Sequence, residues 1–118
     1  MAVKIKMEKT SGEDVRELSG NLLEAMSGEA ELVAENHYEG SDMRVSMMIF
    51  EKFYFRTSSY AGLTILLTEI QGQKITLDIV GSGGGGGLLN ISWGSNRSFA
   101  EKAQRRAEKL GFVKLSEE

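Results

Sequence analysis

The chain has 118 residues, of which 41% are hydrophobic and 26% charged, and its formal net charge is −3. This length predicts a single α+β domain over residues 1–118, large enough to bury a core without help from disulfides or metals. The sequence has 14 glycines, no proline and no cysteine. Disulfides, thiolate nucleophiles and cysteine-ligated metal centres are therefore excluded, and the negative net charge argues against nucleic-acid binding.

No segment predicts membrane insertion or secretion. The first six residues alternate between apolar and basic and lack the long apolar core of a signal peptide. The longest apolar run, Met47–Phe50, is far shorter than the roughly 18 residues that a membrane-spanning helix needs. We therefore expect a cytoplasmic protein with no membrane contact.

The N-terminal third predicts a strand followed by a helix. Apolar and charged residues alternate over residues 3–8, which is the period of a half-buried strand. Thr10 and Glu13 have the spacing of a capping box, which predicts a helix start there, and Gly28 suits its C-cap. One helical stripe lies between them: Val15, Leu18, Leu22 and Met26.

The middle of the chain predicts consecutive antiparallel strands. β-Branched and aromatic residues are frequent here, and turn residues separate the runs. The predicted strands are Ala30–Tyr38, Met43–Arg56 with a bulge near residues 51–52, Leu63–Ile70 and Lys74–Val80. The intervening turns are residues 40–42, 57–62 and 71–73, and the last strand alternates cleanly between apolar and polar side chains.

A second helix is predicted near the C-terminus. Residues 88–93 are read as a short strand or an irregular segment. Ser98 and Glu101 form a second capping box, and Gly111 suits the residue after the helix. The apolar face of this helix consists of Phe99, Ala103, Ala107 and Leu110.

The predicted fold is an α+β two-layer sandwich, in the order strand, helix, three to five antiparallel strands, helix, with both helices on one face of the sheet. This order resembles the TBP-like and helix-grip arrangements, a likeness that does not imply a function.

The glycine run at residues 81–87 is the most distinctive segment. Backbone without Cβ atoms can turn its N–H groups inward and hold an anion. The glycine spacing of a dinucleotide-binding loop, Gly-x-Gly-x-x-Gly, occurs here only because any run of glycines contains it, and no helix is predicted directly after the run, so a Rossmann fingerprint is not indicated. No Gly-Lys-Ser/Thr sequence follows, so a P-loop is not indicated either. Three uses stay open: a structural loop, a flap that contacts a ligand, and a phosphate cradle.

If the glycine run folds toward the turn at residues 56–59, backbone N–H groups, hydroxyls and a guanidinium would converge beside an aromatic ring. A small anionic ligand would suit this arrangement. The candidate ligand-binding residues are Arg56, Ser58, Ser59, Gly83, Gly84, Gly85, Asn90, Ser92 and Trp93.

His37, the one histidine, lies between Glu35 and Glu39 at strand spacing. Such a row could bind a hard metal or act as a base. A structural metal site, however, draws its ligands from separated segments. We therefore expect an exposed polar strand face, with no metal and no cofactor. No nucleophile elbow accompanies the histidine, which favours a protein that is not an enzyme.

The predicted strand 43–56 has two apolar faces. One carries Val45, Met47, Ile49, Phe53 and Phe55. The other mixes apolar residues with basic ones, and we predict that its Met48, Phe50 and Tyr54 form an exposed patch. Exposed apolar patches mark interfaces or ligand grooves. A homodimer interface is the leading interpretation, and a groove for a small amphipathic anion or burial on both sides are the alternatives.

Basic residues gather in the predicted second helix: Arg97, Lys102, Arg105, Arg106 and Lys109. A solvated helix face explains them most simply, and a patch that binds phosphate or a partner is the alternative.

Two stretches, residues 50–59 and residues 81–94 with the sequence GSGGGGGLLNISWG, resemble a family of small uncharacterised bacterial single-domain proteins. The resemblance implies a cytoplasmic bacterial protein and carries over no catalytic residue. The sequence thus favours a non-catalytic protein that self-associates, or binds a partner or small ligand, through an exposed sheet face. The alternative is a phosphate- or nucleotide-binding protein, or an enzyme, that uses the glycine-rich loop 81–87.

Overall fold

A computed structural model of the chain describes residues 2–10, 12–55, 58–83 and 91–118, without the side chains of residues 91–95. Six antiparallel strands form one sheet, and two helices pack against it. The prediction of an α+β sandwich is confirmed. The elements are β1 (Val3–Lys9), α1 (Val15–Met26), β2 (Glu31–Glu39), β3 (Met43–Tyr54), β4 (Ser59–Ile70), β5 (Ile75–Gly83), α2 (Ile91–Lys109) and β6 (Val113–Glu117).

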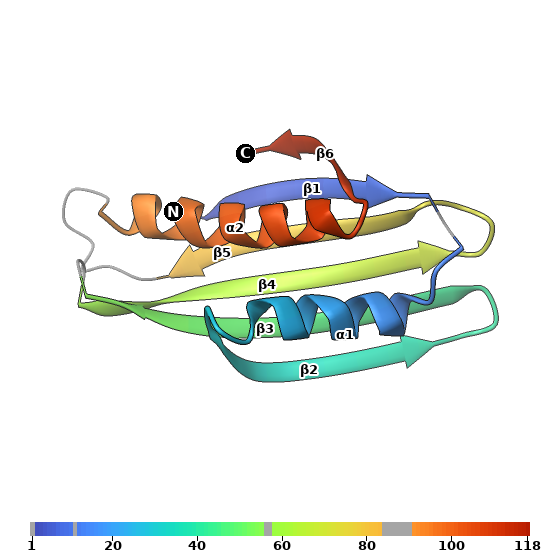
Figure 1. Cartoon of the computed structure of the whole chain (residues 1–118), viewed down its shortest axis with the longest axis horizontal. Helices are drawn as coiled ribbons and strands as arrows, with labels where there is room; N and C mark the ends of the chain where they lie inside the picture. Colours follow the sequence, from blue (N-terminus) through green and yellow to red (C-terminus); the bar gives the residue numbers. More distant parts are fainter. Residues whose placement is uncertain (1, 11, 56–57, 84–90) are drawn as a thin grey trace.

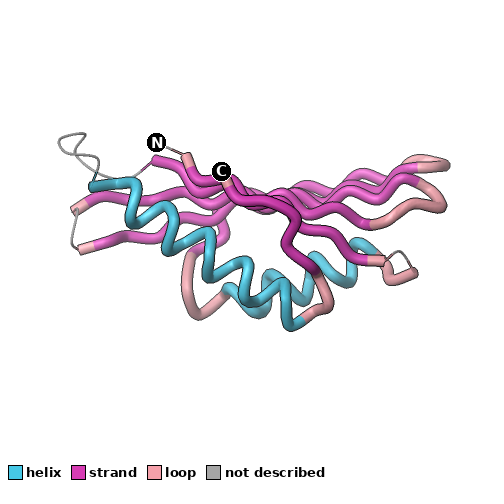
Figure 2. The backbone as a smooth tube through the Cα atoms, turned by 90° about the horizontal axis from the view of Figure 1, so that it is seen from above, coloured by secondary structure: helices cyan, strands magenta, loops and turns pink. Residues whose placement is uncertain are grey.

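The strand order across the sheet is β2-β3-β4-β5-β1-β6 (Figure 1). Strands β2 to β5 form a meander of neighbouring hairpins, and β1 lies between β5 and the C-terminal strand β6. Both helices lie on the same side of the sheet (Figure 2). One face of the sheet is therefore covered by helices, and we call the opposite one the open face.

Helix α1 begins later than the sequence indicated. Its N-cap is Asp14, whose carboxylate accepts a hydrogen bond from the backbone N–H of Arg16 at 2.8 Å. The predicted capping box at Thr10 is wrong, because the Glu13 carboxylate pairs with Lys9 instead. The C-cap is Ser27 and not Gly28. The predicted apolar stripe is confirmed, since Val15, Leu18, Leu22 and Met26 are all buried.

Helix α2 begins earlier than predicted, at Ile91, so Ser98 lies inside the helix and its capping box is wrong. Residues 91–93 are helical, whereas the sequence indicated a short strand or an irregular segment over residues 88–93, of which residues 88–90 lie outside the described ranges. The end of the helix agrees with the sequence. Gly111 adopts a φ of 99°, and the N–H groups of Gly111 and Phe112 bond to the carbonyls of Glu108 and Ala107. Glycine tolerates this left-handed backbone conformation better than any other residue.

Helix α2 crosses β5 at Gly81 in close contact. A Cβ atom at this position would lie 2.5 Å from the backbone oxygen of Asn96 and 3.4 Å from the Cβ of Ala100. Only glycine lets the helix backbone approach the strand this closely. At least one residue of the glycine-rich segment therefore has a packing role.

The strands differ from the prediction in several places. Residues 59–62 belong to β4, which makes the β3–β4 turn shorter than the one predicted, and β5 continues past Val80 to Gly83. Register shifts lie between Leu32 and Ala34 in β2 and between Lys6 and Met7 in β1. The pairing of β3 with β4 is continuous through residues 51–52, where a bulge was predicted. Strand β6 was not predicted. Within the described ranges, neither helix is long and apolar enough to cross a membrane.

Candidate functional site

The two faces of β3 are reversed relative to the sequence prediction. Met48 and Phe50 are 0% exposed and lie in the core on the covered face. The Ser19 hydroxyl of α1 donates to the Met48 sulfur at 3.5 Å, and the Tyr54 ring packs at 6.2 Å from Phe99 of α2. The interface predicted from Met48, Phe50 and Tyr54 is therefore wrong, because the helices cover this face.

The open face carries the alternate residues of each strand. In the middle of the paired strands β3 and β4, Met47 lies beside Leu66 and Ile49 lies beside Thr64. We call the apolar side chains on this side the open-face patch: Tyr38, Met43, Val45, Met47, Ile49, Phe53, Tyr60, Leu66, Ile70 and Val80. Five of them are half-buried by their neighbours, and the other five are exposed by more than a third: Tyr38, Met43, Phe53, Tyr60 and Ile70. This largely apolar surface is the main candidate interaction site.

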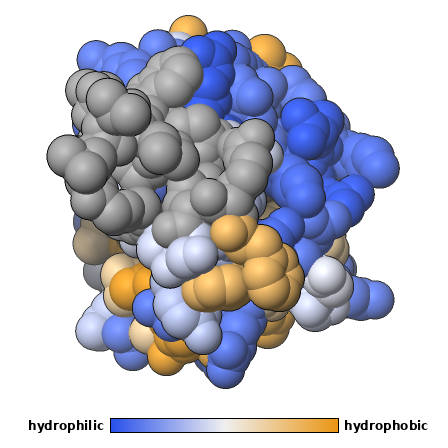
Figure 3. Space-filling view, turned by 90° about the vertical axis from the view of Figure 1, so that its left-hand side faces the viewer, coloured by the Kyte–Doolittle hydropathy of each residue, from blue (hydrophilic) through white to orange (hydrophobic). Residues whose placement is uncertain are grey.

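An aromatic group forms one end of the open-face patch. The Phe53 ring lies 5.2 Å from Phe55 and 5.2 Å from Tyr60, with edge-to-face geometry in both pairs. The exposed fractions are 39% for Phe53, 60% for Tyr60 and 88% for Phe55. Figure 3 views the molecule from this end and shows apolar surface reaching the solvent there. Clustered, exposed aromatic rings are typical of binding surfaces.

Charged groups of both signs surround the open-face patch. On the β1 side, register pairs Lys6 with Asp78 and Lys4 with Val80. Glu51 of β3 pairs with Gly62 and faces the same way as Ile49 and Phe53, so it lies within the patch and separates its aromatic end from the rest. The rim of the patch is thus mixed in charge, which disfavours a uniformly charged partner such as nucleic acid.

His37 is held between two neighbours. Its Nδ1 shares a hydrogen bond of 2.7 Å with the Ser46 hydroxyl, and its Nε2 one of 2.8 Å with Glu35. Glu39 instead lies 3.6 Å from Arg44. This serine–histidine–glutamate arrangement resembles a hydrolase triad in composition, yet Ser46 is only 2% exposed. The hydrogen bond between His37 and Ser46 joins β2 to β3.

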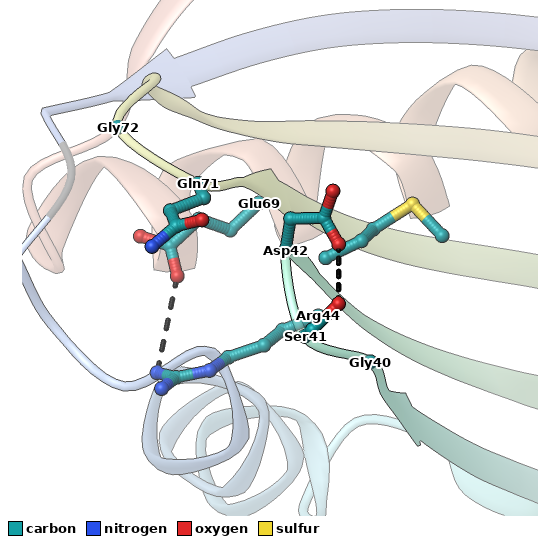
Figure 4. A pocket seen from close by; sticks show the side chains of 8 residues that line it. Gly40, Ser41, Asp42, Arg44, Glu69, Gln71 and Gly72 are labelled. Carbon is teal, nitrogen blue, oxygen red and sulfur yellow. Dashed lines mark hydrogen bonds and ion pairs between the residues drawn. The ribbon is translucent and has the colours of Figure 1, made fainter.

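A polar pocket of about 250 Å³ lies between the β2–β3 and β4–β5 hairpins (Figure 4). The guanidinium of Arg44 lies 3.6 Å from Glu39 and 3.9 Å from Glu69. The backbone carbonyl of Asp42 accepts a hydrogen bond of 2.8 Å from the Gln71 N–H. These contacts join the two hairpins. Since the cation lies between two carboxylates, the pocket does not suit an anionic ligand.

The anion site predicted at the glycine run is only partly within the described residues. Ser58, Ser59 and Gly83 lie at the same end of the sheet, because Ala61 pairs with Gly83. Ser92 and Trp93 lie in the first turn of α2, and their side chains are not described. The remaining predicted residues lie outside the described ranges: Arg56, Gly84, Gly85 and Asn90. Ligand binding by this segment stays a prediction.

The comparisons with known proteins indicate a family and no activity. The model of one family, described as a family of unknown function (DUF6054), matches residues 1–111. A search of the curated proteins finds no match.

Proposed function

Because the chain belongs to the DUF6054 family of unknown function, its role has to be inferred from its own surface, and we propose that it is a non-catalytic binding protein that self-associates. The interface is the open face of the sheet, and the partner is a second copy of the chain. The observation that carries the proposal is the open-face patch. No helix or strand in the described ranges packs over it, whereas the opposite face of the same strands is packed against two helices.

The size of the open face suits a dimer. The molecule measures 46 by 25 by 22 Å, and the sheet extends along the longest dimension. Stable dimers bury about 800 Å² on each partner, which a face of these dimensions can supply. Two sheets stacked face to face at about 10 Å would interdigitate their apolar side chains as in a β-sandwich. The mixed charge of the rim and the small net charge of −3 leave little repulsion between copies.

Edge pairing between copies through β2 is a poorer alternative. The sheet edge at β2 carries Glu31, Glu35 and Glu39, and its register is interrupted between Leu32 and Ala34. Acidic side chains and bulges are devices that prevent edge strands from pairing. Strand β3 is paired on both sides, with β2 and β4, and has no free edge. Association through the open face avoids both obstacles.

The support for a non-catalytic role is the state of His37, whose two ring nitrogens are both engaged with strand residues. The cysteine-free sequence fits the reducing cytoplasm.

The test of self-association is a charge placed in the centre of the open-face patch. Met47→Glu and Leu66→Glu should each convert a dimer to a monomer, because stacking would bury an unpaired carboxylate. Light scattering coupled to gel filtration measures the mass. The control is Arg105→Glu, an exposed position on α2, which should stay dimeric. A wild-type protein that is monomeric at high micromolar concentration would refute the proposal.

A further inference from the structure

Three cationic side chains converge on a single carboxylate on the helix side of the molecule. Glu29 lies in the connection between α1 and β2, and its Oε2 is 2.8 Å from the Lys102 Nζ and 3.9 Å from the Lys52 Nζ. Its Oε1 accepts a hydrogen bond of 2.8 Å from Nη2 of Arg106. Lys52 comes from β3, and the other two cations are four residues apart on one face of α2. We call this group the Glu29 cluster.

The cluster carries more positive than negative charge. Within the described residues, the ion pairs of Lys52, Lys102 and Arg106 all end on Glu29, so three cations share one anion. Arg106 has a further donor, its Nε, which is buried and has no partner in the described part of the chain. Like charges held this close repel one another unless an anion separates them. The cluster therefore has the charge and the donors for more negative charge than one carboxylate supplies.

The pKa values of the cluster agree with this imbalance. Hydrogen bonding to Lys102 lowers the pKa of Glu29. Burial, together with the neighbouring Lys102, lowers the pKa of Lys52, although Glu29 is close by. The hydrogen bond to Glu29 raises the pKa of Lys102, so the carboxylate compensates Lys102 more than it compensates Lys52.

Solvent reaches all four side chains. Their exposed fractions lie between 21% for Glu29 and 33% for Arg106, so each is partly held and partly open. Lys52 is also positioned by the Tyr54 ring, 5.3 Å from its Nζ. Glu29 lies in a hydrogen-bonded turn, with its N–H bonded to the Met26 carbonyl, and this backbone bond does not involve its carboxylate. The carboxylate thus occupies a place that an external anion could take.

We propose that the Glu29 cluster is a binding site for a phosphate dianion, free or as a small phosphomonoester, held by Lys52, Lys102 and Arg106. A phosphate has more acceptor oxygens than a carboxylate and can bond to the three cations at once. Glu29 occupies the site in the free protein and competes with the ligand. The open face takes no part, so the site is independent of the proposed dimer.

The experiment is a titration of uniformly labelled protein followed by amide NMR shifts, with ionic strength held constant by sodium chloride. Inorganic phosphate and glycerol phosphate are separate arms, which distinguish the free ion from a phosphomonoester. We expect saturable shifts around residues 29, 52, 102 and 106. Lys102→Gln or Arg106→Gln should weaken binding at least about tenfold, since each removes a charge-assisted hydrogen bond. The control, Arg105→Gln on the exposed side of the same helix, should change the affinity less than about twofold.

Glu29→Gln separates a ligand site from a purely structural ion-pair cluster. Removing the competing carboxylate should tighten phosphate binding several-fold, whereas a structural cluster gains no affinity for phosphate. The wild-type titration decides the matter even if a variant fails to fold. Absence of saturable shifts in the wild type with either ligand, or equal weakening by Arg105→Gln and Lys102→Gln, would overturn the proposal.

Discussion

The two faces of the sheet use the same strands for different purposes. On the covered face, residues such as Phe50, Ile65 and Leu77 are 0% exposed and form one core with the helices. On the open face, their neighbours Ile49, Leu66 and Val80 are half-buried, and both helices lie on the other side of the sheet. Apolar side chains on the first face therefore stabilise the fold. The same kinds of side chain on the second face contribute much less to folding and remain available for a partner.

The strands themselves differ in how clearly they mark the two faces. Strand β5 alternates strictly, with Ile75, Leu77 and Ile79 buried between less buried residues. Strand β3 is apolar on both sides, and its covered face also contains Ser46 and Lys52. Periodicity alone identifies the buried side of β5 but not that of β3.

The largest effect should come from paired truncations of two phenylalanines on opposite faces of β3. Phe50→Ala should destabilise the protein by about 3–5 kcal/mol, because it leaves a cavity in the core. Phe53→Ala should cost less than about 1 kcal/mol, because its ring is 39% exposed. Urea unfolding of dilute protein measures both. Similar losses for the two variants would show that the open face is also covered.

A paired glycine-to-alanine experiment tests how closely α2 covers the sheet. Gly81→Ala should destabilise the protein by about 1–3 kcal/mol, because the new Cβ would lie 2.5 Å from the Asn96 oxygen. Gly20→Ala in α1 is the control, since a Cβ atom added there would point into open space, with no packing neighbour within 4 Å. It should stabilise the helix by up to about 1 kcal/mol. Thermal unfolding compares the two, and an unchanged Tm for Gly81→Ala would contradict the close contact.

The smallest expected effect is on the pH dependence of stability, through Glu29 on the covered side of the sheet. Because the folded pKa of Glu29 lies below its ordinary value, the unfolded chain takes up the proton first as the pH falls. The Glu29 carboxylate therefore stabilises the fold above its pKa in the unfolded chain, and this stabilisation is lost as the pH drops through its pKa in the folded protein. Glu29→Gln should therefore flatten the acid limb of stability against pH. Urea midpoints measured across that limb test this, and parallel curves for the two proteins would contradict it.

Local sequence patterns predicted most of the elements. The alternation at residues 3–8 and the stripe from Val15 to Met26 each specify an element, because a single face is apolar in both. Helix starts were less predictable. The Thr10 and Ser98 capping boxes match a pattern that also occurs by chance, and the actual N-cap of α1, Asp14, uses a shorter contact to Arg16.

The candidate site was harder to predict because it depends on register. Residues paired across neighbouring strands lie on the same face of the sheet, so the buried side of β5 identifies the buried sides of β4 and β3. Leu77 of β5 pairs with Leu67 of β4, and Ile65 of β4 pairs with Met48 of β3. This chain of pairings would have assigned Met48 to the core. To follow these pairings from β4 to β3, the length of the β3–β4 turn must be known. The sequence left that length ambiguous, because residues 57–62 are mostly polar or small. The Glu29 cluster joins three distant segments, and no local pattern marks such a group.

The place of β1 in the sheet has a consequence for how the chain folds. Every ladder partner of β1 is distant in sequence, and the nearest pair is Lys9 with Ile75. The meander from β2 to β5 needs only short loops, whereas β1 must wait for β5 and β6. Closing loops of this length slows folding. Strand β1 is thus among the last of the six strands to be paired, and the sheet is complete only when β6 bonds to it.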